Sequence, residues 1–318
     1  MRLLLGIVLL CWGSAFAQSG YPSKPVRLVV SFPAGGISDV LARALAIPLG
    51  RQLGEQVIVE NKPGAGTTIA GDYITRQAPD GYTLWLQDVT THAINAALYS
   101  KLPYDSMKDF TYVAMVASTP LMLVAHPSTP AKSVGELIAL LKASPGKYSY
   151  GSSGNGTIVH LAAEMLKSRA GVDALHVPYK GSNPATAAIL GGEVSFVFST
   201  MPPAISNVRA GRLQALAVTT PKRVAAAPEV PTMIESGLRD FEIVLYSGIL
   251  GPKGMERALV ERLNAELAKV VQVPEIRNVY DKIGADPIAM TPAAFEQATA
   301  AEIAKLAPVV KASGAKVD

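Results

Sequence analysis

Hydrophobic residues in this chain form short uninterrupted runs, which alternate with stretches where apolar residues recur at helical spacing. Such runs are typical of strands in a parallel sheet that helices cover on both faces. We expect strands at residues 26–30, 56–61, 82–88, 121–126, 147–153, 194–200 and 213–220. The pattern therefore predicts an α/β fold.

Start and stop signals predict helices between these strands. The glycine turn at residues 33–36 precedes a stretch with one apolar helical face. Ser133 and Glu136 have the spacing of a capping box. Asn183 and Pro184 read as the N-cap and first residue of a further helix.

The order of the elements predicts two α/β units and then a mostly helical tail, whose last helix should start at Thr291-Pro292. A chain of 318 residues exceeds the size at which one core usually keeps growing. We expect crossings between lobes near residues 118–120 and 219–221. The expected divisions are a first lobe at residues 18–120, a second lobe at 121–220 and a return to the first lobe at 221–318.

The first residues resemble a secretory signal peptide. Arg2 is followed by an apolar run at residues 3–12 and by small residues before an expected cleavage near Ala17, so residues 1–17 would be removed. The only cysteine of the sequence, Cys11, lies in this segment; lipidation is the alternative, but leucines precede it where small residues are needed. The mature chain should therefore lack disulfides and thiolate metal sites, and no later run is long enough to span a membrane.

Charge is mildly positive and dispersed, with 29 Lys and Arg against 25 Asp and Glu. No basic stripe with interleaved aromatic residues occurs, so we expect no nucleic-acid partner. The histidines at positions 92, 126, 160 and 176 lack the paired spacing of metal ligands. We therefore expect no metal and no cofactor, and the positive balance suits either a small anion or an ordinary solvated surface.

The sequence GSSGNGT at residues 151–157 joins an expected strand to an expected helix. It places hydroxyl and amide side chains, with backbone N–H groups, at a helix N-terminus, where free donors and the helix dipole favour an anion. An ordinary glycine turn is the alternative. The sequence FPAGG before Ser38 has the same form in the first lobe, with Phe32 as an apolar wall, and Lys180 could steer an anion or simply be solvated.

Ligands of open parallel sheets lie beyond the carboxyl ends of the strands. The loops after the strands at 26–30, 82–88, 147–153 and 194–200 should therefore converge on one cleft.

The sequences of these loops do not match the enzyme motifs that we considered, so we expect no catalytic residue. Ser153 lies in Gly-x-Ser-Gly-Asn rather than in a nucleophile elbow, and Val159 stands where a dinucleotide fingerprint needs glycine. An exported serine hydrolase that uses Ser152 or Ser153 with His160 is the alternative hypothesis, although no third member is evident.

Several longer motifs occur in one order along the chain: VRLVVSFPAGGISD, VENKPGAGTTIAGDYI, HAINAALYSKLPYD, YGSSGNGTIVHLAAEML, HVPYKG, ILGGEV and AGRLQALAVTT. Together they resemble the Bug family, the extracytoplasmic solute receptors of tripartite tricarboxylate transporters. The resemblance implies a two-lobe, type II (Venus flytrap) periplasmic-binding-protein fold, in which each lobe is a mostly parallel sheet flanked by helices. It also implies a periplasmic location.

The resemblance further implies a small mono- or dicarboxylate ligand, aliphatic or aromatic, and membrane permease subunits as partners. We expect a monomer. A liganded receptor that acts on a sensor protein is the alternative, because transport and signalling would use the same closure of the lobes.

The predicted ligand contacts combine the loop chemistry with this resemblance. In the first lobe they are Phe32, Ala34, Gly35, Gly36, Ser38, Thr90, His92 and Tyr246. In the second lobe they are Ser152, Ser153, Asn155, Gly156, Thr157 and Ser199.

Departures from the family pattern concern both lobes. Many relatives have aspartates at Ser195 and near Ser199, and a tryptophan at Leu245. Asp88 ends a strand where small residues are common. Fewer second-lobe carboxylates would reduce repulsion of an anion, and the missing indole would open apolar space if Leu245 lines the cleft. A relative's particular ligand therefore does not transfer to this chain.

Overall fold

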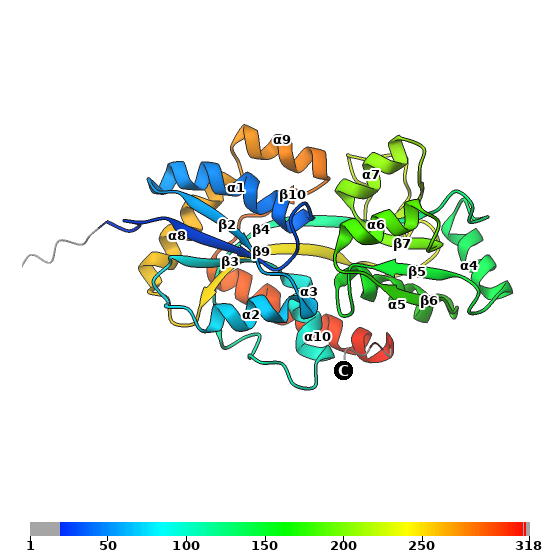
Figure 1. The fold of residues 1–318 in the computed structure, drawn as a ribbon, viewed down its shortest axis with the longest axis horizontal. Coiled ribbons are helices and arrows are strands. Elements are labelled where there is room, and N and C mark those ends of the chain that lie inside the picture. The colour runs from blue at the N-terminus through cyan, green and yellow to red at the C-terminus, as the bar shows by residue number, and fades with distance from the viewer. Residues whose placement is uncertain (1–19, 314, 316–318) are drawn as a thin grey trace, which may run out of the picture.

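The computed structural model describes residues 20–313 and residue 315. The predicted signal peptide lies outside these residues. Two lobes lie side by side, and β4 (Phe110–Ala125) runs through both of them (Figure 1). No helix in the described part of the chain combines the length and the apolar character needed to cross a membrane.

The sheet of the first lobe has the strand order β2-β1-β3-β9-β4. Its strands are β1 (Val26–Val30), β2 (Val57–Asn61), β3 (Thr83–Asp88), β9 (Val244–Pro252), the first part of β4, and the short β10 (Asp286–Pro287) beside β4. The first three are parallel, whereas β9 is antiparallel to β3 and β4. The helices are α1 (Ile37–Leu53), the 3-10 turn η1 (Ala65–Thr67), α2 (Thr68–Thr75), α3 (Val89–Leu98), α8 (Arg257–Val270), α9 (Pro274–Ile283) and α10 (Pro292–Ser313).

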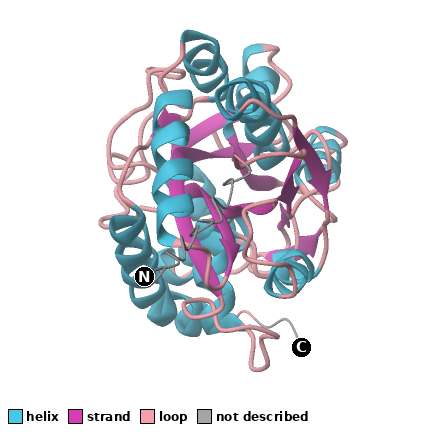
Figure 2. Ribbon diagram, turned by 90° about the vertical axis from the view of Figure 1, so that its left-hand side faces the viewer, coloured by secondary structure: helices cyan, strands magenta, loops and turns pink. Residues whose placement is uncertain are grey.

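In the second lobe, residues 121–125 of β4 pair antiparallel with β7 (Phe196–Thr200) and β8 (Gln214–Val218). β5 (Ser149–Ser152) lies next to β7, and β6 (Leu175–Pro178) lies next to β5, all three parallel. The helices are α4 (Val134–Ala143), α5 (Ile158–Ala170), α6 (Ser182–Leu190) and α7 (Met201–Arg209). Figure 2 shows helices around the strands on both sides, as the sequence predicts.

Helix α1 illustrates how local sequence produces these elements. The turn before it contains Gly35 at a φ of +83°, a conformation that glycine adopts without strain. Gly54, also at +83°, ends the helix, and its N–H bonds to the Gly50 carbonyl. Between these glycines, Leu41, Leu45 and Leu49 are buried against the sheet.

The predicted helix starts at Ser133 and Pro292 are confirmed. Ser133 Oγ accepts a hydrogen bond from the Glu136 N–H at 3.2 Å, and α10 begins at Pro292. The Glu136 carboxylate accepts from the N–H of Lys132 at 2.7 Å rather than from Ser133. The capping box is therefore reciprocal but reaches one residue further back.

Helix α6 starts earlier than predicted. Its N-cap is Gly181 and its first residue is Ser182, so Pro184 is the third helical residue. Proline is tolerated there because the N–H groups of the first turn have no acceptor inside the helix.

The strands between the lobes were not fully predicted. The run at 121–126 is the end of a strand that begins at Phe110, and β9 lies in the tail that was expected to be mostly helical. Pro120 did not end β4, because it falls where β4 exchanges β9 for β7 and β8 as neighbours. Its missing N–H is tolerated at this change of partners.

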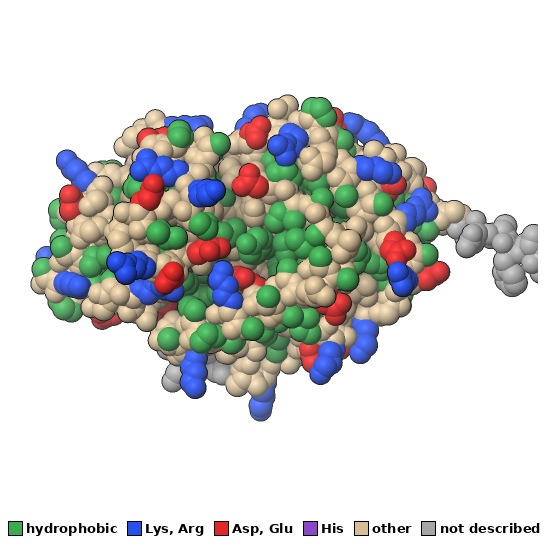
Figure 3. All heavy atoms as spheres, turned by 180° about the vertical axis from the view of Figure 1, so that it is seen from behind, with side chains coloured by type: hydrophobic (Ala, Val, Ile, Leu, Met, Phe, Trp, Pro, Cys, Tyr) green, Lys and Arg blue, Asp and Glu red, His purple; other side chains and the backbone are tan. Residues whose placement is uncertain are grey.

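Helix α10 packs against α3 of the first lobe and α5 of the second. On the face opposite to Figure 1, side chains of both charges are scattered around apolar ones (Figure 3). The dispersed charge of the sequence therefore remains dispersed on this surface.

Candidate functional site

The loops at the carboxyl ends of β1, β3, β5, β6 and β7 line one cavity between the lobes, including the loops that the sequence led us to expect there. The cavity holds about 470 Å³ of space between atoms, counting its open mouth. From the first lobe it is lined by Phe32, Pro33, Ala34, Gly36, Ile37, Ser38, Asp88 and Leu245. From the second lobe it is lined by Ser153, Thr157, Ile158, Val159, Lys180, Gly181, Ser182, Asn183, Pro184 and Thr200.

Helices α1, α5, α6 and α7 all begin at this cavity. Their N-caps, Gly36, Thr157, Gly181 and Thr200, make no side-chain hydrogen bond to the helix in the described structure. The first-turn N–H groups also lack acceptors inside the helix. In α7, Pro202 and Pro203 have no N–H, so this helix offers mainly the Thr200 hydroxyl. Backbone donors and positive dipole ends from both lobes therefore face one space.

Two buried hydroxyl groups lie at the same cavity without a partner. Ser38 in α1 is 2% exposed and Thr200 before α7 is 3% exposed. Neither side-chain oxygen has a hydrogen-bond partner among the described residues. Leaving such a group unsatisfied costs about 1–3 kcal/mol. A ligand in the cavity would supply the missing partner.

Asp39 holds the first-lobe loop in shape. Its carboxylate accepts hydrogen bonds from the Gly35 N–H at 2.9 Å, from Arg43 Nε at 3.0 Å and from Asn61 Nδ2 at 2.9 Å. Burial alone would raise the pKa of Asp39, but these hydrogen bonds together lower it below its usual value. The Gly35 N–H is thereby occupied, whereas Phe32, Ala34, Gly36 and Ser38 line the cavity.

The second-lobe loop presents hydroxyls and a cation. Ser153 Oγ donates to Thr157 Oγ1 at 3.2 Å, and Thr157 donates to the Gly154 carbonyl at 2.8 Å. Lys180 lines the same cavity and forms no ion pair with any described residue. This wall therefore offers hydrogen-bond donors and a positive charge.

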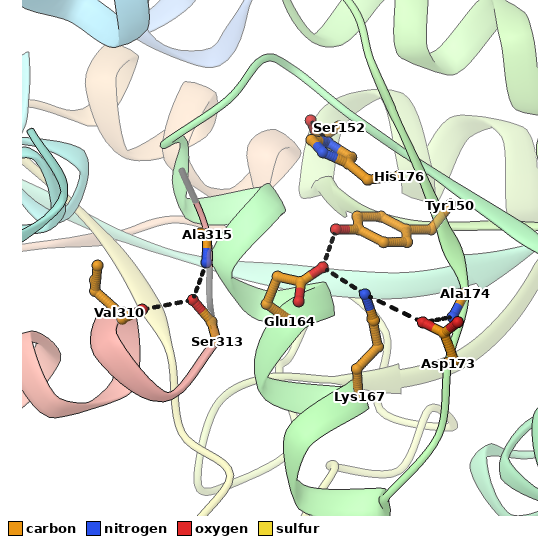
Figure 4. Close-up of polar contacts among 10 residues, drawn as sticks. All are labelled: Tyr150, Ser152, Glu164, Lys167, Asp173, Ala174, His176, Val310, Ser313 and Ala315. Atoms are coloured by element: carbon orange, nitrogen blue, oxygen red, sulfur yellow. Dashed lines mark hydrogen bonds and ion pairs between the residues drawn. The ribbon is translucent and has the colours of Figure 1, made fainter. Parts of the chain in front are cut away.

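Ser152 faces away from the cavity. Its hydroxyl lies 2.7 Å from His176 Nε2, and the His176 ring stacks on His160 at 4.1 Å between centroids. Beneath them Tyr150 donates a hydrogen bond to Glu164, which also pairs with Lys167 (Figure 4). Ser152 thus supports the loop from behind instead of contacting a ligand in the cavity.

This arrangement does not support the serine-hydrolase hypothesis. Ser152 pairs with His176 and not with His160, whose Nδ1 accepts from the Gly156 N–H at 3.2 Å. Burial lowers the pKa of His176 to about 3, and repulsion from His160 and Lys167 adds to the shift. Such an imidazole is a poor general base near neutral pH.

Thr90 and Tyr246 tie α3 to β9 and do not line the cavity. Thr90 Oγ1 donates to the Val244 carbonyl at 2.8 Å and accepts from the Tyr246 N–H at 3.1 Å. Because alternate residues of a strand face opposite sides, Leu245 lines the cavity and Tyr246 packs with the first-lobe core.

His92 and Ser199 also lie outside this cavity. The His92 ring packs against Trp85 and Phe110, with Nε2 3.0 Å from the Ser106 carbonyl oxygen. Burial lowers the pKa of His92 to about 4. Ser199 donates to the Thr200 carbonyl at 3.2 Å and lines a smaller space behind Ser153.

The two lobes also touch beside a neighbouring space, which is lined by Gly66 and Asn155. The predicted contacts Asn155 and Gly156 do not line the cavity itself. A Cβ atom on Gly66 would lie 3.2 Å from the Asn155 carbonyl oxygen, and one on Gly181 would lie 3.3 Å from Pro33 Cγ. Glycine permits these approaches, so the structure represents a closed arrangement of the lobes.

Four of the lining residues, Asp88, Asn183, Thr200 and Leu245, were not predicted as contacts, and the role of Lys180 was left open. Asn183 and Thr200 carry a usable signal, since each is a polar residue where a strand or its loop leads into a helix. Leu245 and Asp88 were noticed only as departures from the family pattern. Their placement at the cavity makes both departures relevant to the ligand.

Asp88 is buried at the start of α3 and caps it. One carboxylate oxygen accepts from the Thr91 N–H at 3.0 Å and the other from the Thr91 hydroxyl at 2.6 Å. Burial raises the pKa of Asp88 to about 6 against these hydrogen bonds, and repulsion from Glu302 adds to the rise. Within the described chain, no cluster of His, Cys, Asp and Glu has the form of a metal site.

Comparisons with known proteins agree with this architecture. The sequence profile described as "Tripartite tricarboxylate transporter family receptor" matches residues 41–315. Protein BugT of Bordetella pertussis is 35% identical over 317 residues, 99% of this chain and 97% of BugT.

Two solved structures with bound ligands are similar throughout. R. palustris Rpa4515 with adipate has a TM-score of 0.89 at 32% identity, covering 93% of this chain and 100% of that one. MatC from Rhodopseudomonas palustris with bound malate has a TM-score of 0.86 at 29% identity, covering 91% and 100%.

Proposed function

Because the chain belongs to the Bug family of tripartite tricarboxylate transporter receptors, we propose that it captures a small carboxylate between its lobes and delivers it to a membrane permease. Members of this family are periplasmic solute receptors and not enzymes. The predicted two-lobe, type II fold is likewise confirmed. The proposal includes export of this chain by its N-terminal segment.

The convergence of helix N-termini on one cavity is the observation that carries this proposal. Each N-terminus stabilises a nearby negative charge by about 0.3–1 kcal/mol, and each hydrogen bond to a charged group contributes about 1.5–3 kcal/mol. Three or four such bonds, less the loss of ligand freedom, correspond to roughly micromolar affinity, about −8 kcal/mol. The relatives solved with adipate and malate support the same ligand class.

Isothermal titration calorimetry against small carboxylates and their neutral amides tests the proposal. We expect saturable binding of a carboxylate at one site per chain, no binding of its amide, and recovery of unchanged ligand. Thr200→Val and Ser38→Ala should each weaken binding by about 1–3 kcal/mol, because each removes a hydroxyl at the cavity. Ser206→Ala, at an exposed hydroxyl of α7, is the matched control. Wild-type affinity in both cavity variants would place the ligand elsewhere.

Delivery to a permease is separable from action on a sensor protein. Both partners would recognise the closed, liganded form. Pull-down from membranes with and without ligand should recover transporter subunits only in the liganded state. Recovery of a sensor protein alone would overturn the transport part of the proposal and leave carboxylate capture intact.

A further inference from the structure

The first-lobe wall contains a charge of the wrong sign for an anion. Asp88 is the only acidic residue among the described residues that line the cavity. It is 2% exposed and lies at the end of β3, across the cavity from the starts of α5 and α6. A ligand with carboxylates at both ends would therefore bring one of them toward a buried aspartate.

No Lys or Arg of the described chain forms an ion pair with Asp88. Its carboxylate accepts hydrogen bonds from the N–H and hydroxyl of Thr91, and the Thr90 N–H also stabilises its charged form. A carboxylate has about four acceptor positions, and Thr91 and the Thr90 N–H leave about one of them free. The charge that contributes to its pKa shift, on Glu302 of α10, is also negative. Acceptor capacity and negative charge thus remain unused beside the cavity.

Capping of α3 does not by itself require a charged residue. Asn and Ser cap helix N-termini about as well as Asp, and they accept the same backbone hydrogen bond. The buried hydroxyl of Ser38 lies at the same cavity and also lacks a partner. The first-lobe wall therefore adds acceptor oxygens, on Asp88 and Ser38, that a donor group of a ligand can use.

We propose that Asp88 makes this receptor selective for carboxylates whose opposite end carries a hydrogen-bond donor, an amine or a hydroxyl, and selective against dicarboxylates. This inference rests on the proposed function. The carboxylate would lie against the starts of α5 and α6, and the donor would point toward Asp88. Asp88 is then a specificity-determining residue of the first-lobe wall.

Calorimetry with chain-matched probes at neutral pH tests the inference. The probes are adipate, 6-aminohexanoate, 6-hydroxyhexanoate and hexanoate, with the corresponding four- and five-carbon series. In the series that binds best, the amino or hydroxy acid should bind at least about ten-fold more tightly than the dicarboxylate of equal length. Equal or tighter binding of the dicarboxylate would overturn the inference.

Variants at Asp88 provide a second test of this selectivity. Asp88→Asn should reduce the preference by at least about ten-fold, and Asp88→Ser, which keeps a capping oxygen, serves if the amide variant does not fold. Asp281→Asn removes the same charge from an exposed position of α9 and should leave the preference unchanged. An unchanged preference in both Asp88 variants would overturn the inference.

The two proposals fail differently. If folded, ligand-stripped wild-type protein binds no probe of any series, carboxylate capture itself is wrong. If dicarboxylates bind well and Asp88→Asn does not alter the ratio, only the selectivity is wrong.

Discussion

The two walls of the cavity differ in what they offer a ligand. The second-lobe wall combines the starts of α5, α6 and α7 with Lys180, and it offers donors and positive charge. The first-lobe wall has the start of α1, but it also has Phe32, Leu245 and Asp88. The backbone of the fold thus supplies the anion site, while side chains at a few strand ends decide which anion fits.

Two buried aspartates of the first lobe sharpen this comparison. Asp39 is paired with Arg43 and accepts a hydrogen bond from Gly35, and its pKa is lowered. Asp88 forms no ion pair with a cation of residues 20–313, and burial raises its pKa to about 6. Aspartate therefore stabilises a loop at position 39, whereas at position 88 its negative charge has no cationic partner in the described chain and faces the cavity.

The largest effect is expected where the two walls touch. Gly181 has a φ of +108°, and a Cβ there would lie 3.3 Å from Pro33 Cγ. Gly181→Ala should therefore weaken ligand binding by about 2–3 kcal/mol, through backbone strain and impeded closure. Gly211→Ala is the control, since Gly211 has a φ of +69° but no atom within 4 Å of the added Cβ. Calorimetry that finds both variants equal to wild type would contradict closure at this contact.

The charge on Asp88 should appear as pH-dependent stability. Its folded-state pKa of about 6 lies above its value in an unfolded chain, so its stabilising contribution is complete below about pH 4 and is lost as pH rises through 6. Wild type should lose on the order of 2–3 kcal/mol of unfolding free energy relative to Asp88→Asn over this window. Urea unfolding of both proteins without ligand measures the difference, and parallel pH profiles would refute it.

Asp39 should show the opposite sign. Its folded-state pKa is lowered, so its contribution is present above the unfolded-state value and is lost as pH falls. Asp39→Asn should destabilise the protein by about 1–3 kcal/mol at neutral pH, because it weakens hydrogen bonds to a charged group. The same urea series measures this, and a variant as stable as wild type at neutral pH would show that the ion pair contributes nothing.

The smallest effect concerns Lys180. This exposed cation at the cavity should attract anions before contact. Lys180→Met should lower the association rate a few-fold and flatten its dependence on salt, with little change in dissociation. Stopped-flow kinetics with Lys222→Met as an exposed control separates the two rates. A change confined to dissociation would instead make Lys180 a direct contact.

Local signals predicted much of the fold. Apolar runs located β1, β2 and β3, and start signals located α4 and α10. The antiparallel strand β9 and the first part of β4 escaped notice, because their pairing depends on segments far apart in the chain. Pro120 looked like a boundary but lies inside β4.

The site was predicted at the level of loops and less well at the level of side chains. Ser153 lines the cavity while Ser152 turns toward His176, and Leu245 lines it while Tyr246 turns toward the core. Neighbouring residues thus differ in direction, which the packing of the whole lobe decides. His92 shows the same limit, since α3 carries it into an aromatic core.

A thermal-shift screen tests carboxylate capture most directly. Ligand-stripped wild type and Gly181→Ala would be melted with aliphatic and aromatic carboxylates and with their neutral amides. At one hundred times the dissociation constant, a bound ligand should add roughly 2.7 kcal/mol of stability. We predict a clear shift of wild type with one class of carboxylates, none with the amides, and a smaller shift in Gly181→Ala. No shift across the panel, or equal shifts with acids and amides, would contradict an anion site at the converging helix N-termini.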